Sequence, residues 1–257
     1  MTKVDLLVFG PHPDDIEIGF GGSVALHAGR GFRVGLCDLT QGELGSNGTV
    51  DDRLAEAEAS RAVMGAEWRL NLGWPDGGVY DTPEHVSDVV RLVRAAQPRV
   101  IAIPYWNDRH PDHRAASECL SRAVFKAGLR RFDVDRAPHK PERVCFYFIN
   151  DEAPVSFGLD VSEVYDKKRQ ALACHETQFA PTAQDSVQTR LTSSAFRQLI
   201  ESRDARLGAL TGVAYAEGVV VRETILFHDL FGNGMKMGRR RNTNDTPGAG
   251  AHNEDGR

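Results

Sequence analysis

Two short clusters of histidines and acidic residues stand out in the chain. The first, HPDDIE over residues 12–17, holds one imidazole and three carboxylates, and the second, HPDH over residues 110–113, holds two imidazoles and one carboxylate. Charge at this density beside an apolar segment is costly to bury unless a cation or solvent compensates it. The residue types therefore indicate a metal site, an acid–base site or both.

Three of these side chains suit a catalytic metal ion. His12, Asp15 and His113 offer two imidazoles and one carboxylate, which fits Zn²⁺ with its fourth position left for water. The same donors fit Fe²⁺ in a facial triad, so the ligand types leave both metals open. Asp14 is adjacent to Asp15 and cannot easily share its role. One of the two can bind the metal while the other accepts a proton from the bound water.

The second cluster also suits proton donation. The Asp112 carboxylate could orient the His110 imidazole and favour its protonated form. Each cluster has a purely structural alternative: HPDD as a turn with an aspartate cap, and HPDH as a helix start with Pro111 in its first turn. We favour the active-site interpretation because both clusters occur together, each after a predicted strand.

Apolar runs that alternate with amphipathic segments must position the clusters. Strands are expected over 4–9, 33–40, 68–72, 99–104, 143–149 and 218–227, and helices over 23–29, 51–64, 84–96, 115–127, 162–175 and 193–209. This alternation predicts an α/β fold with a mainly parallel sheet and helices on both faces. Ligands bind at the carboxyl ends of such strands, so this topology allows both clusters to face one crevice.

The same order along the chain predicts a single domain over residues 1–230. No repeat or linker interrupts this stretch. In the segment 231–257 polar and small residues dominate. Such a segment cannot bury enough apolar surface to offset its ordering entropy, and we expect it to be disordered.

The composition narrows the class of protein. The 257 residues carry 31 Lys and Arg against 36 Asp and Glu, a net charge of −5, without the basic excess of a nucleic-acid-binding protein. No apolar stretch approaches the ~20 residues of a membrane span, and the first residues lack the apolar region of a signal peptide. None of the four cysteines forms a CxxC pair. We expect a cytoplasmic protein with reduced thiols, no nucleic-acid partner and no membrane contact.

At these motifs the chain resembles the PIG-L/LmbE-like family of zinc-dependent N-acetylglucosaminyl deacetylases. It looks closest to the bacillithiol-biosynthesis branch, whose substrate is N-acetylglucosaminyl malate. The resemblance covers residues 3–230 and rests on the segments 10–17, 37–40, 45–49, 108–113 and 215–218, together with Arg53. It implies a Rossmann-like fold with the active site at the carboxyl edge of the sheet.

The resemblance also implies a role for each site residue. By motif position the three metal candidates look like the zinc ligands, and Asp14 looks like the general base. His110, supported by Asp112, resembles the electrophilic or acid histidine. Arg53 falls where branch members place an arginine near the substrate. Several members carry a late-loop tyrosine near the oxyanion, but the comparable stretch 192–196 has none.

The expected reaction is hydrolysis of the acetamide of an N-acetylglucosamine conjugate, a small-molecule substrate. In a malate conjugate, Arg53 and Arg109 could bind the carboxylates, because a bidentate guanidinium suits a carboxylate. Arg109 could equally pair with a local acid such as Asp108 or Asp112. The branch resemblance further suggests a homo-oligomer.

Two other functions stay open at this point. One is a deacetylase or amidase that acts on another N-acetylglucosamine or thiol conjugate. The other is a non-catalytic α/β domain that binds a metal or a nucleotide. Pure binding does not need an acid–base complement such as Asp14 and His110, which favours the enzyme.

Overall fold

The computed structural model describes residues 2–132, 135–182, 184 and 186–226. Contacts divide the chain into one unit over Met1–Arg222 and another over Glu223–Arg257. The first unit holds both clusters and all helices and strands of the described residues. In the second unit only residues 223–226 are described, and they form neither a helix nor a strand. The segment 231–257, for which the sequence predicts disorder, lies outside the described residues.

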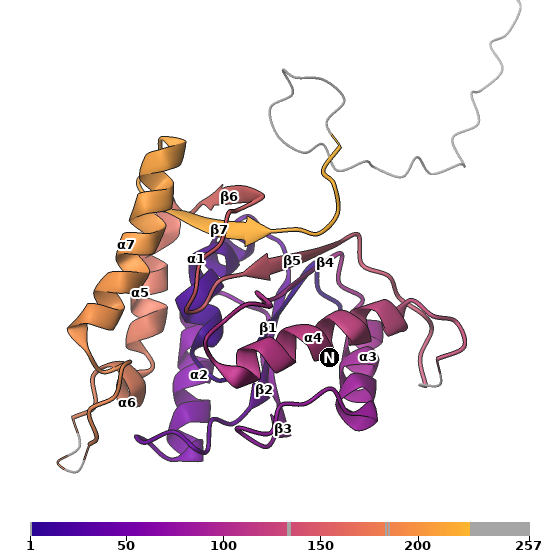
Figure 1. Cartoon of the computed structure of the whole chain (residues 1–257), viewed down its shortest axis with the longest axis horizontal. Coiled ribbons are helices and arrows are strands. Elements are labelled where there is room, and N and C mark those ends of the chain that lie inside the picture. The colour runs from indigo at the N-terminus through magenta and orange to yellow at the C-terminus, as the bar shows by residue number, and fades with distance from the viewer. Residues whose placement is uncertain (1, 133–134, 183, 185, 227–257) are drawn as a thin grey trace, which may run out of the picture. The chain divides into compact units, whose positions relative to one another are not determined.

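The described strands form one mixed sheet in the order β3-β2-β1-β4-β5-β7-β6 (Figure 1). Their bounds are β1 (Leu6–Gly10), β2 (Val34–Thr40), β3 (Trp68–Trp74), β4 (Val100–Pro104), β5 (Arg143–Tyr147), β6 (Phe157–Asp160) and β7 (Ala216–Val220). The first five strands run parallel, and β7 is antiparallel to both β5 and β6. The predicted mainly parallel sheet is confirmed. The short strand β6 is absent from the sequence prediction, and β7 ends well before the predicted residue 227.

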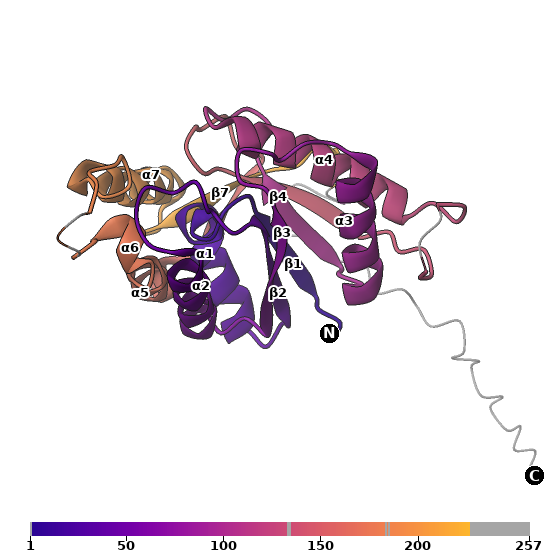
Figure 2. The same cartoon turned by 90° about the horizontal axis from the view of Figure 1, so that it is seen from below.

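Helices cover both faces of the sheet, as predicted (Figure 2). They are α1 (Asp15–Gly29), α2 (Val50–Met64), α3 (Pro83–Ala96), α4 (Pro111–Ala127), α5 (Tyr165–Ala173), α6 (Glu176–Phe179) and α7 (Ser194–Thr211), with a 3₁₀ turn at Ser162–Val164. Helices α3 and α4 pack together on one face, and α1, α2 and α5 pack together on the other. None of the described helices has both the length and the apolar character to cross a membrane.

The central strand β1 shows why the sheet needs both helical layers. All of its residues are buried. Leu7 and Phe9 belong to the hydrophobic core shared with α3 and α4, whereas Leu6 and Val8 belong to the core shared with α1. Successive side chains of a strand point to opposite faces, so a strand covered on both faces is apolar throughout. This explains the uninterrupted apolar run that predicts the strand.

Helix α1 begins much earlier than the predicted helix 23–29. Glycines weaken helical propensity, and the stretch GFGG over 19–22 therefore argues against a helix in the sequence. The structure shows what these glycines provide. A Cβ at Gly19 would overlap the carbonyl oxygen of Phe148, so glycine lets α1 pack directly beside β5. The Glu217 carboxylate accepts the backbone N–H groups of Gly22 and Ser23, at 2.9 and 2.7 Å, and stabilises this part of the helix.

The two chemical clusters meet at one edge of the sheet. Strands β1 and β4 are parallel neighbours, so their carboxyl ends lie side by side. The first cluster follows β1 and runs into α1, and the second follows β4 and runs into α4. Helix α4 begins at Pro111, earlier than the predicted residue 115. Each cluster thus joins the end of a strand to the start of a helix, which fixes its side chains on rigid elements.

Candidate active site

The structure brings the three predicted metal ligands together. His12 Nδ1 lies 3.0 Å from Asp15 Oδ2, and His113 Nε2 lies 3.2 Å from the same oxygen. All three side chains are buried, and one possible ligand atom from each lies within 4.8 Å of the others. His12, His110 and Asp112 satisfy the same distance, but His110 is exposed. Two converging imidazoles and a carboxylate fit Zn²⁺ or Fe²⁺.

The charge around this cluster also favours a cation. His12 Nε2 lies 3.2 Å from Asp76 Oδ1 and 3.3 Å from Asp112 Oδ2. Burial lowers the pKa of His12, but hydrogen bonds to Asp112, Asp15 and Asp76 outweigh burial and hold the pKa well above its usual range. An environment that stabilises a positive charge on His12 would also stabilise a bound metal cation.

The carboxylate of Asp108 orients His113, one of the three predicted metal ligands. Its Oδ1 lies 3.1 Å from His113 Nδ1. Asp108 is itself fixed, because it accepts the backbone N–H of His110 at 2.8 Å and the Asn150 side-chain and backbone N–H groups at 3.0 Å each. Burial lowers the pKa of His113, but Asp15 and Asp108 outweigh it and raise the pKa to about 9. A carboxylate on the second nitrogen of a histidine ligand is a common way to fix its tautomer and orientation.

Asp14 is a buried carboxylate placed directly beside the metal cluster. Its φ of 127° lies in the left-handed half of the backbone map, which costs a non-glycine residue about 1–3 kcal/mol. Burial raises its pKa to about 6, with Arg53 acting in the opposite direction and Asp15 adding to the rise. Such a pKa lies close to neutral pH, where a general base is most effective. The geometry therefore supports the predicted role of Asp14.

Arg53, on helix α2, contacts Asp14 and the two loops next to it. Its guanidinium is buried and donates to the carbonyl oxygens of Gly42 at 2.9 Å and Pro13 at 2.6 Å, and to Asp14 Oδ2 at 3.1 Å. Gly42 has φ +69°, and a Cβ there would overlap the guanidinium, so only glycine fits. Arg53 lines the cavity described below; its two terminal nitrogens donate to protein oxygens, and its buried Nε has no hydrogen-bond partner among the described residues. Its contribution in this structure is to hold Asp14 in place.

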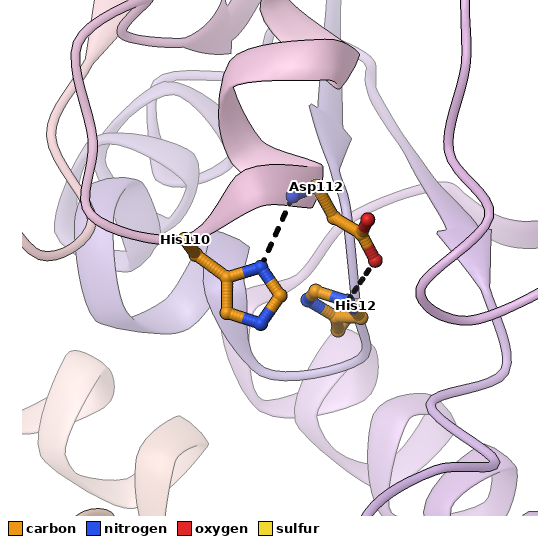
Figure 3. Close-up of side chains that lie close together, drawn as sticks. All are labelled: His12, His110 and Asp112. Atoms are coloured by element: carbon orange, nitrogen blue, oxygen red, sulfur yellow. Dashed lines mark hydrogen bonds and ion pairs between the residues drawn. The ribbon is translucent and has the colours of Figure 1, made fainter.

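The predicted pairing of the Asp112 carboxylate with His110 is wrong. Figure 3 shows that His110 Nδ1 accepts the backbone N–H of Asp112, at 3.2 Å, while the Asp112 carboxylate turns to His12. That carboxylate also accepts the backbone N–H of Gly77 at 2.8 Å. His110 is the N-cap of α4, so the structural alternative for HPDH holds as well. Burial, followed by His113 and His12, lowers the pKa of His110 and favours a neutral ring with its proton on Nε2.

Both clusters line one cavity of about 570 Å³. The clusters share a crevice, as the predicted topology allows, and Arg53 and Arg109 line it too. The walls also include side chains that sequence reasoning misses, from four further segments: Asp76, Asn150, Gln178, Arg190 and Phe196. Only Asp76 had a signal, because the turn PDGG follows a predicted strand and falls at the same edge of the sheet.

Arg109 has no acidic partner among the described residues. The carboxylates of Asp108 and Asp112, its alternative partners in the sequence, are occupied by His113, Asn150, His12 and the backbone. The side chain is exposed at the cavity. Local pairing of Arg109 is therefore not what the structure shows, and its charge is available to a ligand.

Comparison with known proteins identifies the family. The family described as PIG-L, GlcNAc-PI de-N-acetylase, matches residues 7–124. The chain is 29% identical to a diacetylchitobiose deacetylase of Thermococcus kodakarensis, over 87% of this chain and 85% of the relative. It is 28% identical to a probable N-acetyl-alpha-D-glucosaminyl L-malate deacetylase 2 of Bacillus subtilis, over 68% of this chain and 84% of the relative.

A solved structure agrees with this match. The conserved protein TT1542 of Thermus thermophilus is 35% identical and superposes with a TM-score of 0.82, covering 90% of this chain and all of that one. The chain belongs to the PIG-L family, and the two curated relatives above are named as deacetylases of N-acetylglucosamine compounds. The finer expectation, the bacillithiol branch, is not settled, because the relatives differ in their substrates.

Proposed function

We propose that this protein is a metal-dependent deacetylase that hydrolyses the acetamide of an N-acetylglucosamine conjugate. One observation carries the proposal: two imidazoles and a carboxylate converge beside a buried aspartate whose pKa is raised to about 6, all in one cavity. Pure metal binding requires the first feature but not the second. The non-catalytic alternative is therefore less well supported.

The residues divide the reaction between them. A zinc or iron ion held by His12, Asp15 and His113 would act as a Lewis acid and lower the pKa of water from 15.7 to about 7. Asp14 takes one proton from the attacking water and later gives it to the leaving amine as the C–N bond breaks. Neutral His110 donates its Nε2 proton in a hydrogen bond to the developing oxyanion. This differs from the protonated His110 that the sequence suggests.

For the aglycone we propose malate first, which places the enzyme in bacillithiol biosynthesis. The support is the malate-conjugate relative and the unpaired guanidinium of Arg109 at the cavity. Diacetylchitobiose is the second candidate, because the relative that acts on it matches most of this chain. A cytoplasmic location and a homo-oligomeric state stay predictions from the sequence, as does the absence of nucleic-acid and membrane partners.

The test is amine release by the purified full-length chain from both substrates. The protein is assayed as purified, after removal of metal by a chelator, and after addition of Zn²⁺ or Fe²⁺. We expect turnover that the chelator abolishes and a metal restores, with a preference for N-acetylglucosaminyl malate. Turnover that persists in verified metal-free protein would contradict the mechanism. Turnover of diacetylchitobiose alone would keep the mechanism and remove the malate assignment.

A further inference from the structure

Arg190 is the least expected side chain in the cavity wall. It lies in the loop between α6 and α7 and shares the cavity with Arg109 and His110. Its Nη1 donates to Asn150 Oδ1 at 3.0 Å, and its guanidinium carbon lies 4.8 Å from the centre of the Phe196 ring. The guanidinium thus rests on an aromatic face, with one nitrogen tied to an amide.

The surroundings hold Arg190 in this position. Its carbonyl oxygen accepts the Ser193 hydroxyl at 2.7 Å, and Ser193 is the N-cap of α7. Phe196, in the first turn of α7, is only 4% exposed. Asn150 is fixed by two hydrogen bonds to Asp108. The backbone, the stacking partner and the hydrogen-bond acceptor are therefore ordered before any ligand arrives, which lowers the entropy cost of binding.

The free edge of Arg190 has the form of an anion-binding group. Its Nη1 serves Asn150, while its Nε and Nη2 make no hydrogen bond within the described residues. Two parallel N–H donors on one edge of a guanidinium match the two oxygens of a carboxylate or phosphate. A residue with only a structural role would be expected to use this edge on carbonyl oxygens, as the buried Arg94 does.

The charges of Arg109 and Arg190 also favour an anion in this part of the cavity. Arg109 and Arg190 line one cavity, and neither forms an ion pair within the described residues. Burial lowers the pKa of Arg190, and the positive charge of Arg109 lowers it further, against weaker opposing effects of Asp151 and Asp108. Two like charges that line one cavity repel each other, and an anion bound between them would relieve this repulsion.

We propose that Arg190 is a specificity-determining residue that, together with Arg109, binds an anionic group on the aglycone of the substrate. The assignment of the anion to the aglycone of a substrate rests on the proposed function. The possible ligands share an anionic group, either a planar carboxylate or a tetrahedral phosphate, that presents two oxygens to the guanidinium. The pair selects conjugates with a charged aglycone over neutral ones such as a disaccharide.

The direct test is anion binding to the zinc-loaded full chain, measured by calorimetry with L-malate and with inorganic phosphate. We expect saturable binding that weakens about tenfold in Arg190→Ala and in Arg109→Ala, the loss of one charge-assisted hydrogen bond or more. Arg197→Ala is the matched control, because Arg197 lies on α7 and donates to the Phe179 carbonyl outside this cavity. Tighter binding of L-malate would identify a carboxylate ligand, and tighter binding of phosphate a phosphate ligand.

Kinetics separate this subsite from the reaction itself. In Arg190→Ala we expect the KM for N-acetylglucosaminyl malate to rise about tenfold with kcat within about twofold, and the KM for diacetylchitobiose to stay unchanged. Binding that is equal in wild type and Arg190→Ala would mean that the anion sits on the metal, and would overturn the proposal. An equal loss of kcat on both substrates would also overturn it. Anion binding that depends on Arg190 without any turnover would instead reject the proposed function and leave the subsite.

Discussion

The cavity has two walls of different construction. The first, which we call the metal corner, consists of residues 12–15 and 110–113, and it comes from two continuous motifs at the ends of adjacent strands β1 and β4. The second, the C-terminal wall, consists of Asn150, Gln178, Arg190 and Phe196, which come from separate segments. The metal corner holds the groups that can carry out hydrolysis. The C-terminal wall holds groups that can select what is hydrolysed. The reaction can therefore stay constant while the substrate changes.

The largest effect should come from removing the base of the metal corner. Asp14→Asn keeps the shape of the side chain but cannot take a proton from water. We expect kcat to fall about 10²–10⁴-fold, with KM for the malate conjugate and metal content unchanged. Asp51→Asn, an exposed carboxylate on α2, is the control. If kcat of Asp14→Asn stays close to that of wild type, the base lies elsewhere.

The next largest effect should be on stability, at a buried ion cluster outside the cavity. Lys168 Nζ, fully buried on α5, lies 2.6 Å from Asp204 on α7 and 2.6 Å from Glu217 on β7. Asp204→Asn leaves part of this buried charge unpaired, and we expect a loss of about 3–5 kcal/mol in the free energy of unfolding at pH 7. Asp166→Asn removes an exposed ion pair with Arg169 on the same helix. This variant should change the free energy of unfolding by less than about 0.5 kcal/mol. Chemical denaturation of the two variants measures both values.

The buried pair of Lys168 and Asp204 also predicts how the stability of the protein depends on pH. Burial raises the pKa of Asp204, but Lys168 and Arg203 outweigh it and lower the pKa below its ordinary value. A carboxylate with a lowered pKa in the folded state contributes stability above its unfolded pKa of about 3.9 and loses it as pH falls. The difference between wild type and Asp204→Asn should therefore shrink from pH 6 to pH 3. A difference that grows towards low pH would contradict this account.

The third largest effect should come from His110 in the metal corner, which we propose to act as a neutral hydrogen-bond donor. His110→Asn keeps an acceptor for the N-cap of α4, because asparagine caps helices well, but removes the Nε2 donor. We expect kcat to fall about 10²–10³-fold, the usual result of losing one oxyanion donor. The metal content and the unfolding temperature should stay as in wild type. A variant with wild-type kcat would leave His110 with only its capping role.

The difference between the walls also explains what the sequence could predict. A continuous motif such as HPDD carries its own geometry, because a strand end and a helix start fix residues only a few positions apart. The convergence of His12, Asp15 and His113 follows from the adjacency of two parallel strands, and their residue types suit a metal ion. Arg190 gives no such signal, since its importance depends on a loop that reaches the cavity through contacts far apart in sequence.

The two wrong sequence predictions have a common cause, because in each case contacts with distant residues decide the local structure. The carboxylate of Asp112 is expected on His110 because the two residues are neighbours in sequence. In the first turn of α4, however, the backbone N–H of Asp112 reaches His110, and its side chain turns to His12 and Gly77. The start of α1 is misplaced because GFGG disfavours a helix, whereas the close approach to Phe148 requires those glycines. Tertiary contacts override the local preference in both cases.

The smallest effect should arise where the two walls join. Asp108 contacts the predicted ligand His113 on one side and, through Asn150, the guanidinium of Arg190 on the other. Asp108→Asn should lower the affinity for zinc about 10–100-fold, as is usual for the partner of a histidine ligand, measured by competition with a chelator. Asp51→Asn, the exposed carboxylate on α2, again serves as the control.

Because Asn150 would lose its anchor in Asp108→Asn, the KM for the malate conjugate should rise as well, by less than in Arg190→Ala. The measurement is made at saturating zinc, so that the weaker metal affinity does not contribute. A variant that loses zinc affinity but keeps the wild-type KM would show that the two walls are independent. A rise in both values would show that one carboxylate orients the metal ligand and the specificity residue together.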